Sequence, residues 1–109
     1  MLNKEKIIHK VYEDLCRTAP NFDCVKAATE LEKRGFRRVS GFFKDDNGKY
    51  NPHEWNRDEF NGKIIDLANK FDGRSGVLII GPFHPLWERY KPIGSLDFST
   101  NPPTVKRFY

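Results

Sequence analysis

The sequence predicts an α+β domain in which about three helices pack on one face of a small, mainly antiparallel sheet. Its 109 residues are the length of one domain. Three stretches carry apolar residues at helical spacing, at residues 3–17, 22–34 and 57–71. The remaining apolar stretches are short and are separated by Gly, Pro and Asn-Gly turn signals. The predicted order of elements is therefore α-α-β-α-β-β-β within a single domain, residues 1–109.

The first helix is predicted over residues 3–17. Ile8, Val11 and Leu15 recur at helical spacing, and the lysines fall on the other side. Asn3 has the side chain of a helix N-cap. We expect the apolar stripe to face the sheet.

A second helix is predicted over residues 22–34. Asn21 or Asp23 can cap its start, and Val25, Ala28 and Leu31 form its apolar side. Gly35 suits the position after the last turn, where the backbone often adopts a left-handed conformation. The chain then looks extended from residue 36 to residue 43.

An Asn-Gly pair at residues 47–48 indicates a tight turn after this strand. Residues 49–52 follow as a short edge strand or a loop. The third helix is predicted over 57–71, because Asn56 and Glu59 are spaced like a capping box. Its apolar stripe consists of Phe60, Ile64, Leu67, Ala68 and Phe71.

Residues 77–80 form a continuous aliphatic run, which predicts a central strand buried on both faces. Residues 86–90 and 93–99 are predicted to form a hairpin across Lys91-Pro92. Residues 104–109 would add an edge strand. This hairpin would place His84 opposite Asp97.

Composition excludes several classes of protein. Hydrophobic residues make up 38% of the chain and the formal net charge is +4, which argues against a disordered chain. The longest aliphatic run is four residues and no apolar stretch suits a signal peptide, so we expect a cytoplasmic location. The three histidines show no zinc-type spacing, and we expect no metal and no cofactor.

Cys16 and Cys24 are too few for a disulfide scaffold. They are most simply two free thiols in a reducing compartment. A disulfide between them and a catalytic role for one of them remain alternatives.

The leading functional hypothesis is an RNA-directed activity, either a ribonuclease or a toxin-like effector. RNA cleavage needs a proton acceptor, a proton donor and cations near the phosphate; His84 and Glu88 would supply the acid–base groups, and Asp97 would orient one ring nitrogen of His84. Aromatic rings would stack on bases and cations would contact phosphates. The candidate RNA-binding residues are Arg34, Arg37, Arg38, Trp87, Arg89, Tyr90, Lys91, Lys106 and Arg107.

One stretch supports that hypothesis through a resemblance. The segment from His84 to Glu88, followed by residues 94–97, is similar to the His-x-x-x-Glu stretch of ribosome-cleaving colicin domains. The resemblance implies ribonuclease chemistry centred on His84. Gly81 stands where those domains carry an acidic residue.

A second hypothesis is a protein-interaction module or inhibitor without catalytic activity. The chain holds nine phenylalanines and two tryptophans, more than a small core must contain. An exposed aromatic patch would bind a protein partner. Its predicted members are Phe83, Trp87, Phe108 and Tyr109.

A third hypothesis is a cysteine hydrolase. Cys24 lies in the first turn of a predicted helix, where the helix dipole favours a thiolate. Cys24, His84 and Asp97 follow the order of papain-type nucleophile, base and orienting residue. The Asp23-Cys24 start of a helix ending at Gly35 resembles NlpC-type peptidoglycan hydrolases. That resemblance implies a nucleophilic Cys24.

His53 offers a further reading within the segment Asn51-Pro52-His53-Glu54-Trp55. A His-Glu pair beside a tryptophan suits a metal or proton-transfer site. The simpler interpretation is that Trp55 packs against the start of the helix predicted after it.

Overall fold

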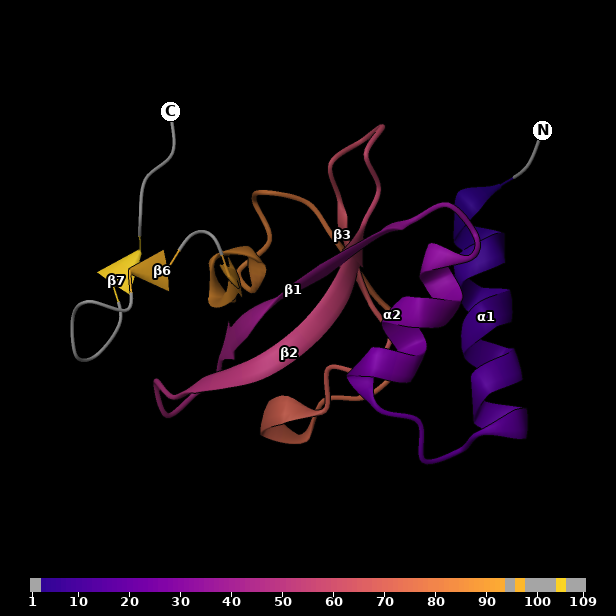
Figure 1. The fold of residues 1–109 in the computed structure, drawn as a ribbon, viewed down its shortest axis with the longest axis horizontal. Helices are drawn as coiled ribbons and strands as arrows, with labels where there is room; N and C mark the ends of the chain where they lie inside the picture. Colours follow the sequence, from indigo (N-terminus) through magenta and orange to yellow (C-terminus); the bar gives the residue numbers. More distant parts are fainter. Residues whose placement is uncertain (1–2, 94–95, 98–103, 106–109) are drawn as a thin grey trace.

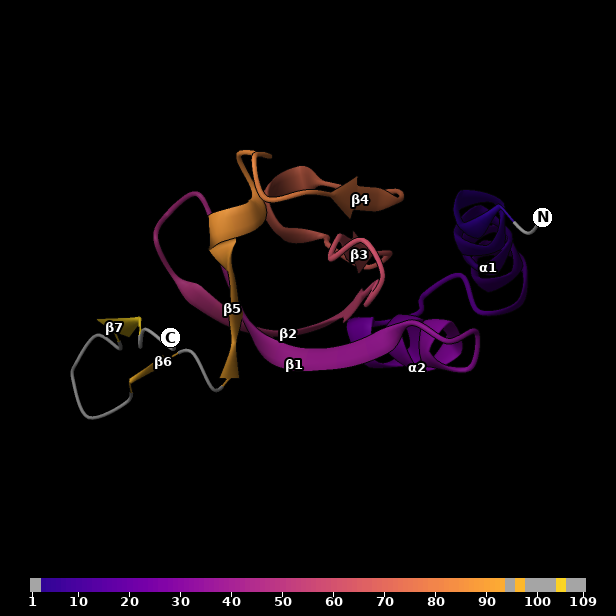
Figure 2. The ribbon, with the colours of Figure 1, turned by 90° about the horizontal axis from the view of Figure 1, so that it is seen from above.

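Two N-terminal helices lie at one end of a strongly curled antiparallel sheet (Figures 1 and 2). The computed structural model describes residues 3–93, 96–97 and 104–105. The helices are α1 (Lys4–Thr18) and α2 (Cys24–Glu32), with short 3-10 helices η1 (Phe71–Gly73) and η2 (Trp87–Arg89). The strands are β1 (Arg37–Lys44), β2 (Tyr50–Arg57), β3 (Ile64–Asp66), β4 (Leu78–Ile80), β5 (Tyr90–Pro92), β6 (Leu96–Asp97) and β7 (Thr104–Val105).

The main sheet has the order β4-β3-β2-β1-β5, and every neighbouring pair is antiparallel. β6 and β7 pair with each other in a separate two-stranded sheet. The predicted α+β class is therefore confirmed. The described residues contain two α-helices instead of about three.

Both N-terminal helices form where the sequence predicts them. The Asn3 side chain caps α1 by accepting from the Glu5 backbone N–H, and Asp23 caps α2 by accepting from that of Lys26. Gly35 adopts a φ of 93° just after α2, as its left-handed position requires. Because Asp23 is the cap, α2 begins at Cys24 instead of residue 22.

β2 is much longer than the predicted edge strand at residues 49–52. It pairs with β1 over eight residue pairs, from Arg37 opposite Arg57 to Lys44 opposite Tyr50. The turn predicted at Asn47-Gly48 joins them, with Gly48 at a φ of 80°. This long hairpin is the frame of the sheet.

The predicted helix at 57–71 is wrong. The Asn56 side chain does not cap a helix; it donates to the backbone oxygens of Ala28 and Phe36 and ties β2 to α2. The Asp58 carboxylate instead accepts from the Phe60 backbone N–H and turns the chain into β3. Within 57–71, Arg57 pairs with β1 and residues 64–66 pair with β2 and β4, and this pairing outweighs a helical spacing of apolar residues.

The predicted arrangement of the C-terminal strands is also wrong. β4 lies at an edge of the main sheet instead of its centre, and Leu78 and Ile79 are only half-buried. Residues 87–89 form η2, so the strand predicted over 86–90 does not form. β5 pairs with β1 instead. Asp97 of β6 lies opposite Thr104 of β7 and not opposite His84.

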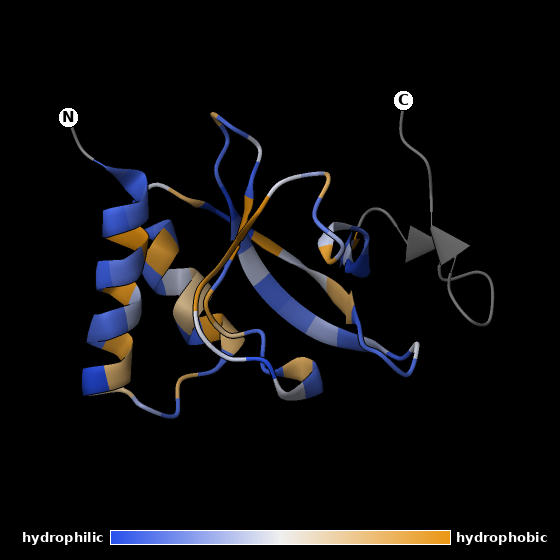
Figure 3. Cartoon of the chain, turned by 180° about the vertical axis from the view of Figure 1, so that it is seen from behind, coloured by the Kyte–Doolittle hydropathy of each residue, from blue (hydrophilic) through white to orange (hydrophobic). Residues whose placement is uncertain are grey.

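The sheet separates two clusters of buried side chains. One joins the apolar stripes of α1 and α2, visible as hydrophobic bands in Figure 3, to Ile65 of β3. The other lies inside the curl of the sheet and contains Phe43, Trp55, Ile64, Ile80 and Tyr90. Ile64 and Ile65 face opposite clusters because successive residues of a strand point to opposite faces.

No helix among the described residues combines the length and the apolar character needed to cross a membrane.

Candidate active site

Cys24 is the first residue of α2, directly after the Asp23 cap. It is half-buried and is a free thiol, as is the exposed Cys16. Its thiol lies close enough to the His53 imidazole and to the Glu54 backbone for both groups to lower its pKa. α2 therefore places the half-buried Cys24 beside His53 in the middle of β2.

His53 and Asp66 form a buried pair beside this thiol. Nε2 of His53 lies 2.6 Å from Oδ2 of Asp66, and both side chains are 1% exposed. Since Nε2 is engaged by Asp66, Nδ1 is the ring nitrogen that remains for Cys24. The three side chains come from α2, β2 and β3 and form a continuous Cys–His–Asp chain.

A gap in the sheet makes this arrangement fit. β3 pairs with β2 only at Asn56 and Arg57, so the two strands separate at the level of His53. The Glu54 backbone there helps to lower the pKa of the Cys24 thiol.

The electrostatics of the three groups favour a thiolate–imidazolium pair. The hydrogen bond from His53, helped by the Glu54 N–H and opposed by burial, lowers the pKa of the Cys24 thiol. Burial disfavours the charged form of His53, but its hydrogen bonds with Asp66 and Cys24 outweigh burial and raise its pKa to about 9. Near neutral pH, His53 therefore carries its proton while Cys24 tends toward the thiolate.

Tyr90 and Asn69 extend the chain beyond Asp66. The Tyr90 hydroxyl donates to Oδ2 of Asp66 at 2.7 Å, and Nδ2 of Asn69 donates to the Tyr90 hydroxyl at 2.8 Å. The backbone N–H of Ala68 donates to the other oxygen, Oδ1 of Asp66, at 3.0 Å. The Asp66 carboxylate is thus bonded on both oxygens.

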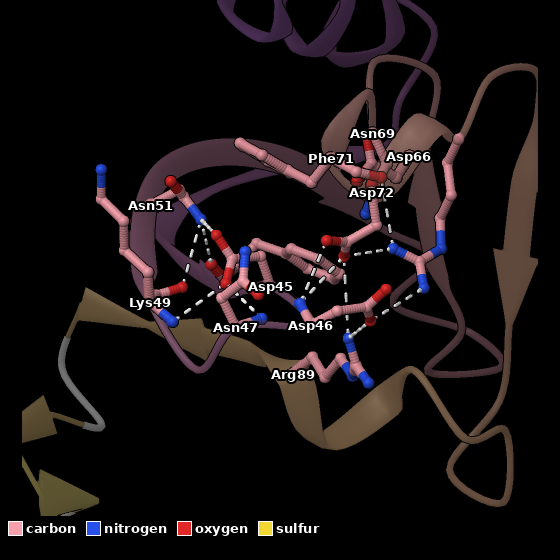
Figure 4. A network of polar contacts seen from close by, with 12 residues as sticks. Asp45, Asp46, Asn47, Lys49, Asn51, Asp66, Asn69, Phe71, Asp72 and Arg89 are labelled. Atoms are coloured by element: carbon pink, nitrogen blue, oxygen red, sulfur yellow. Dashed lines mark hydrogen bonds and ion pairs between the residues drawn. The ribbon is translucent and has the colours of Figure 1, made fainter.

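Aromatic rings enclose the His53 imidazole inside the curl of the sheet. Trp55 stacks on it at a centroid distance of 6.0 Å, and Phe71 meets it edge-on at 5.2 Å. Phe71 belongs to η1, which a polar network ties to the tip of the β1–β2 hairpin (Figure 4). In that network Asp72 accepts from the Asp46 backbone N–H, and Arg89 bonds the Asp46 carboxylate.

The catalytic residues predicted around His84 do not assemble in the same way. His84 is exposed, and its Nδ1 accepts from the Leu86 backbone N–H at 3.1 Å. Glu88 is exposed on η2. Asp97 lies in β6, but its side chain is outside the described part of the structure. Of the four predicted catalytic residues, the structure places Cys24 alone in the Cys–His–Asp chain.

The candidate RNA-binding cations lie near opposite ends of β1. Arg34, Arg37 and Arg38 line a groove beside α1, and Arg38 makes a bidentate pair with Glu54. Arg89 and Lys91 line a second groove at the tip of the β1–β2 hairpin. Lys106 and Arg107 lie outside the described residues.

The predicted aromatic residues divide between surface and core. Phe83 is fully exposed and Trp87 is half-buried beneath the Arg57 guanidinium. Tyr90, assigned to base stacking by the sequence, is 5% exposed and packs between Phe43 and Trp55. Phe108 and Tyr109 lie outside the described residues.

Sequence reasoning underestimated His53 and missed Asp66, Asn69 and Tyr90 as site residues. His53 was recognised as a candidate proton-transfer group, but the helix predicted after it placed Trp55 and Asp66 in the wrong elements. A usable signal was the alternation of buried His53 and Trp55 along an extended segment. Asp66 directly follows the apolar pair Ile64-Ile65, and all three residues are buried in β3.

Comparisons of the chain with protein-family models, with curated proteins and with solved structures gave no match.

Proposed function

We propose that this protein is a cysteine hydrolase that cleaves an acyl bond, such as an amide, ester or thioester. Cys24 is the nucleophile, His53 the general acid and base, and Asp66 the orienting carboxylate. One observation carries the proposal: a half-buried thiol at a helix N-terminus lies beside a buried imidazole, each shifts the pKa of the other, and a carboxylate holds Nε2 of that imidazole at 2.6 Å. This retains the nucleophile of the third sequence hypothesis and replaces His84 and Asp97.

The reaction follows from the charge state of the pair. The Cys24 thiolate attacks the acyl carbon, and the His53 imidazolium gives its proton to the departing amine, alcohol or thiol. The acyl group then forms a thioester with Cys24. Neutral His53 takes a proton from water, the resulting hydroxide attacks the thioester, and Cys24 leaves as thiolate while His53 is again protonated.

The start of α2 provides donors for the negative charge on the acyl oxygen. The first N–H groups of a helix have no partner within that helix. The Asp23 cap occupies the N–H of Lys26, which leaves those of Cys24 and Val25 for the substrate. These donors lie where charge develops when Cys24 attacks.

A purely structural role for the His53–Asp66 pair is the main alternative. Buried ion pairs contribute little net stability, because the cost of removing two charges from water offsets their attraction. A stabilising pair also does not need a thiol on its open side. The half-exposed position of Cys24 at the end of this pair favours the catalytic interpretation.

The first experiment measures the alkylation of Cys24 by iodoacetamide against pH in a Cys16→Ser background. A thiolate–imidazolium pair should keep the rate high well below pH 8 and should make the rate change again near pH 9, where His53 loses its proton. His53→Gln should restore the profile of an ordinary thiol, which titrates at about 8.5. A parent profile that already matches an ordinary thiol would refute the proposal.

The second experiment looks for an acyl-enzyme with an activated aryl ester as the probe. The parent protein should release a burst of phenol proportional to its concentration and should gain the mass of one acyl group on Cys24. Cys24→Ser should abolish the burst, whereas Cys16→Ser should leave it unchanged. Equal bursts from all three proteins would rule out Cys24 as the nucleophile.

A further inference from the structure

We propose that Tyr90 and Asn69 are positioning residues of this site: Tyr90 holds the Asp66 carboxylate for His53, and Asn69 holds the Tyr90 hydroxyl. This inference rests on the proposed Cys24–His53–Asp66 assignment and extends it by two residues. Neither new residue reaches the thiol. Both act through Asp66.

The hydrogen bonds run in one direction along the chain. Asn69 Nδ2 can only donate, so the Tyr90 oxygen accepts from it and must turn its own hydrogen toward Asp66. The same Asp66 oxygen, Oδ2, receives both the Tyr90 hydroxyl and His53 Nε2. The Ala68 N–H holds the other oxygen. The carboxylate is therefore fixed in rotation and presents one lone pair to His53.

Asn69 is costly to keep on grounds of stability alone. It is 2% exposed, and its Oδ1 has no hydrogen-bond partner among the described residues. An unpaired buried carbonyl costs more free energy than an average neutral hydrogen bond returns. A leucine of similar volume would avoid that cost. The single bond that Asn69 does make, to Tyr90, accounts for an amide at this position.

Packing keeps Tyr90 in place independently of its hydroxyl. The ring meets Phe43 and Trp55 edge-on at 5.0 and 5.1 Å. Its neighbour Lys91 lies opposite Phe42 in the β1–β5 ladder. Tyr90→Phe should therefore keep the fold while it removes the bond to Asp66.

The hydroxyl also tunes the basicity of the pair. Its hydrogen is the positive end of a dipole that competes with His53 for the same carboxylate oxygen. Removing that dipole leaves the Asp66 charge to act undivided on the imidazolium, so the pKa of His53 should rise. Among the described residues, three titratable groups face His53: Cys24 from α2, Asp66 from β3 and Tyr90 from β5. The apolar contacts come from the rings of Phe43, Trp55 and Phe71.

An NMR titration of the His53 imidazole tests the proposal without any substrate. The His53 signal is assigned by its loss in His53→Gln. Tyr90→Phe should raise the pKa of His53 by about half a unit, and Tyr50→Phe is the matched control. Tyr50 lies at the far end of β2, where Lys44 stands over its ring. Equal His53 pKa values in the parent, Tyr90→Phe and Tyr50→Phe would overturn the proposal.

A double variant covers the case in which Tyr90→Phe alone unfolds because Asn69 loses its partner. Tyr90→Phe with Asn69→Leu replaces both polar partners by apolar groups, which can be neutral or stabilising. It should fold, raise the pKa of His53 as the single variant does, and lower kcat several-fold with KM unchanged. A stable double variant with the parent pKa would refute the positioning role.

The outcome also separates this inference from the proposed function. A raised pKa of His53 in Tyr90→Phe, together with an absent acyl-enzyme in the parent, would support the positioning chain and refute the hydrolase. A clear acyl-enzyme in the parent, with an unchanged pKa of His53 in Tyr90→Phe, would support the hydrolase and refute the positioning role of Tyr90.

Discussion

Asp66 is the residue on which the protonation state of His53 depends. It accepts from His53, Tyr90 and the Ala68 backbone while it is 1% exposed. Such a group is favourable only when its lone pairs are occupied, because an unpaired buried charge is expensive. Asp66 of β3 therefore links His53 of β2 to Tyr90 of β5 through its carboxylate.

Asp66→Asn should remove the cause that keeps His53 protonated. The neutral amide no longer offsets burial, so the pKa of His53 should fall from about 9 to its ordinary value or below. We expect kcat on an acyl substrate to fall by a factor of about 10² or more, as for other lost acid–base groups. Iodoacetamide alkylation of Cys24 should then lose its acidic plateau. An unchanged alkylation profile would contradict this role of Asp66.

The raised pKa of His53 also predicts how the stability of the fold depends on pH. The pKa of His53 is higher in the folded state than its unfolded value of 6.5, so folding takes up a proton between pH 6.5 and about 9. Stability from this proton is complete below pH 6.5 and is lost as the pH rises through the folded value. The lowered pKa of Cys24 acts in the opposite direction over this range.

Urea unfolding of Cys24→Ala isolates the His53 contribution, because the opposing thiol is gone. Its midpoint should fall as the pH rises above 6.5, over a narrower range than the parent value of about 9 implies, because Cys24 contributes to the raised pKa of His53. Cys24→Ala with Asp66→Asn should show a flat midpoint over the same range. A flat profile in both variants would mean that His53 is not protonated in the folded protein.

At the level of elements, the site depends on how closely β5 approaches β1. Gly41 pairs with Pro92 there, and a Cβ on Gly41 would lie 2.8 Å from the Cα of Pro92 and 2.8 Å from the Trp55 ring. No residue other than glycine fits without moving one of these neighbours. β5 begins with Tyr90, which pairs with Phe43 two residues further along β1.

Gly41→Ala should destabilise the protein by about 1–3 kcal/mol, because β5 must move outward. Gly81→Ala is the control, since a Cβ at Gly81 meets no atom within 4 Å. Thermal melts of the two variants measure the difference. Equal melting temperatures would show that β5 shifts without cost and that its fit does not matter.

η1 is held over His53 by a residue in an unusual conformation. Asp72 has a φ of 58°, accepts from the Asp46 backbone N–H and pairs with Arg74 at 2.8 Å. Asp72→Ala and Asp72→Gly both remove these contacts, but only alanine also incurs the left-handed backbone cost. We expect Asp72→Gly to be more stable than Asp72→Ala by about 1 kcal/mol in urea unfolding. The opposite order would indicate that the segment changes conformation.

Considered as a whole, the molecule has two buried clusters that share the sheet. Leu31 is fully buried in the helix cluster, and Ile80 is 3% exposed in the cluster inside the curl. Because Ile64 and Ile65 are neighbours in β3 and face the two clusters, loss of either cluster should unfold both.

Leu31→Ala and Ile80→Ala should therefore each cost about 2–5 kcal/mol and should each melt in a single transition. Ile79 is half-buried, so Ile79→Ala should cost less than Ile80→Ala. Circular dichroism melts test this when they are followed in the far ultraviolet, which reports the helices, and in the near ultraviolet, which reports the packing of aromatic side chains. Two separate transitions would contradict coupling through β3.

The net charge of +4 keeps the RNA hypothesis open to a direct test. Phosphate contacts by Arg34, Arg37 and Arg89 would release counterions, so RNA binding should weaken steeply between about 50 and 200 mM salt. Substituting glutamine at these three positions should reduce that salt dependence. Binding that is absent at low salt would remove RNA as a partner.

Local sequence was sufficient for the parts of the protein with local causes. The caps Asn3 and Asp23, the left-handed Gly35 and the Asn47-Gly48 turn all act within a few residues, so α1, α2, β1 and the location of Cys24 at a helix start follow from the sequence. The α+β class follows with them.

The identity of the base and of its carboxylate depends on pairing between distant segments. Residues 57–71 carry a helical apolar spacing, yet β1 pairs with residues 50–57, and residues 64–66 form β3 between β2 and β4. That pairing brings His53 to Cys24, 29 positions away in sequence, and the separation of β3 from β2 brings in Asp66. Local propensity is worth at most about 1 kcal/mol per residue, and a complete hydrogen-bonded ladder with a buried face outweighs it.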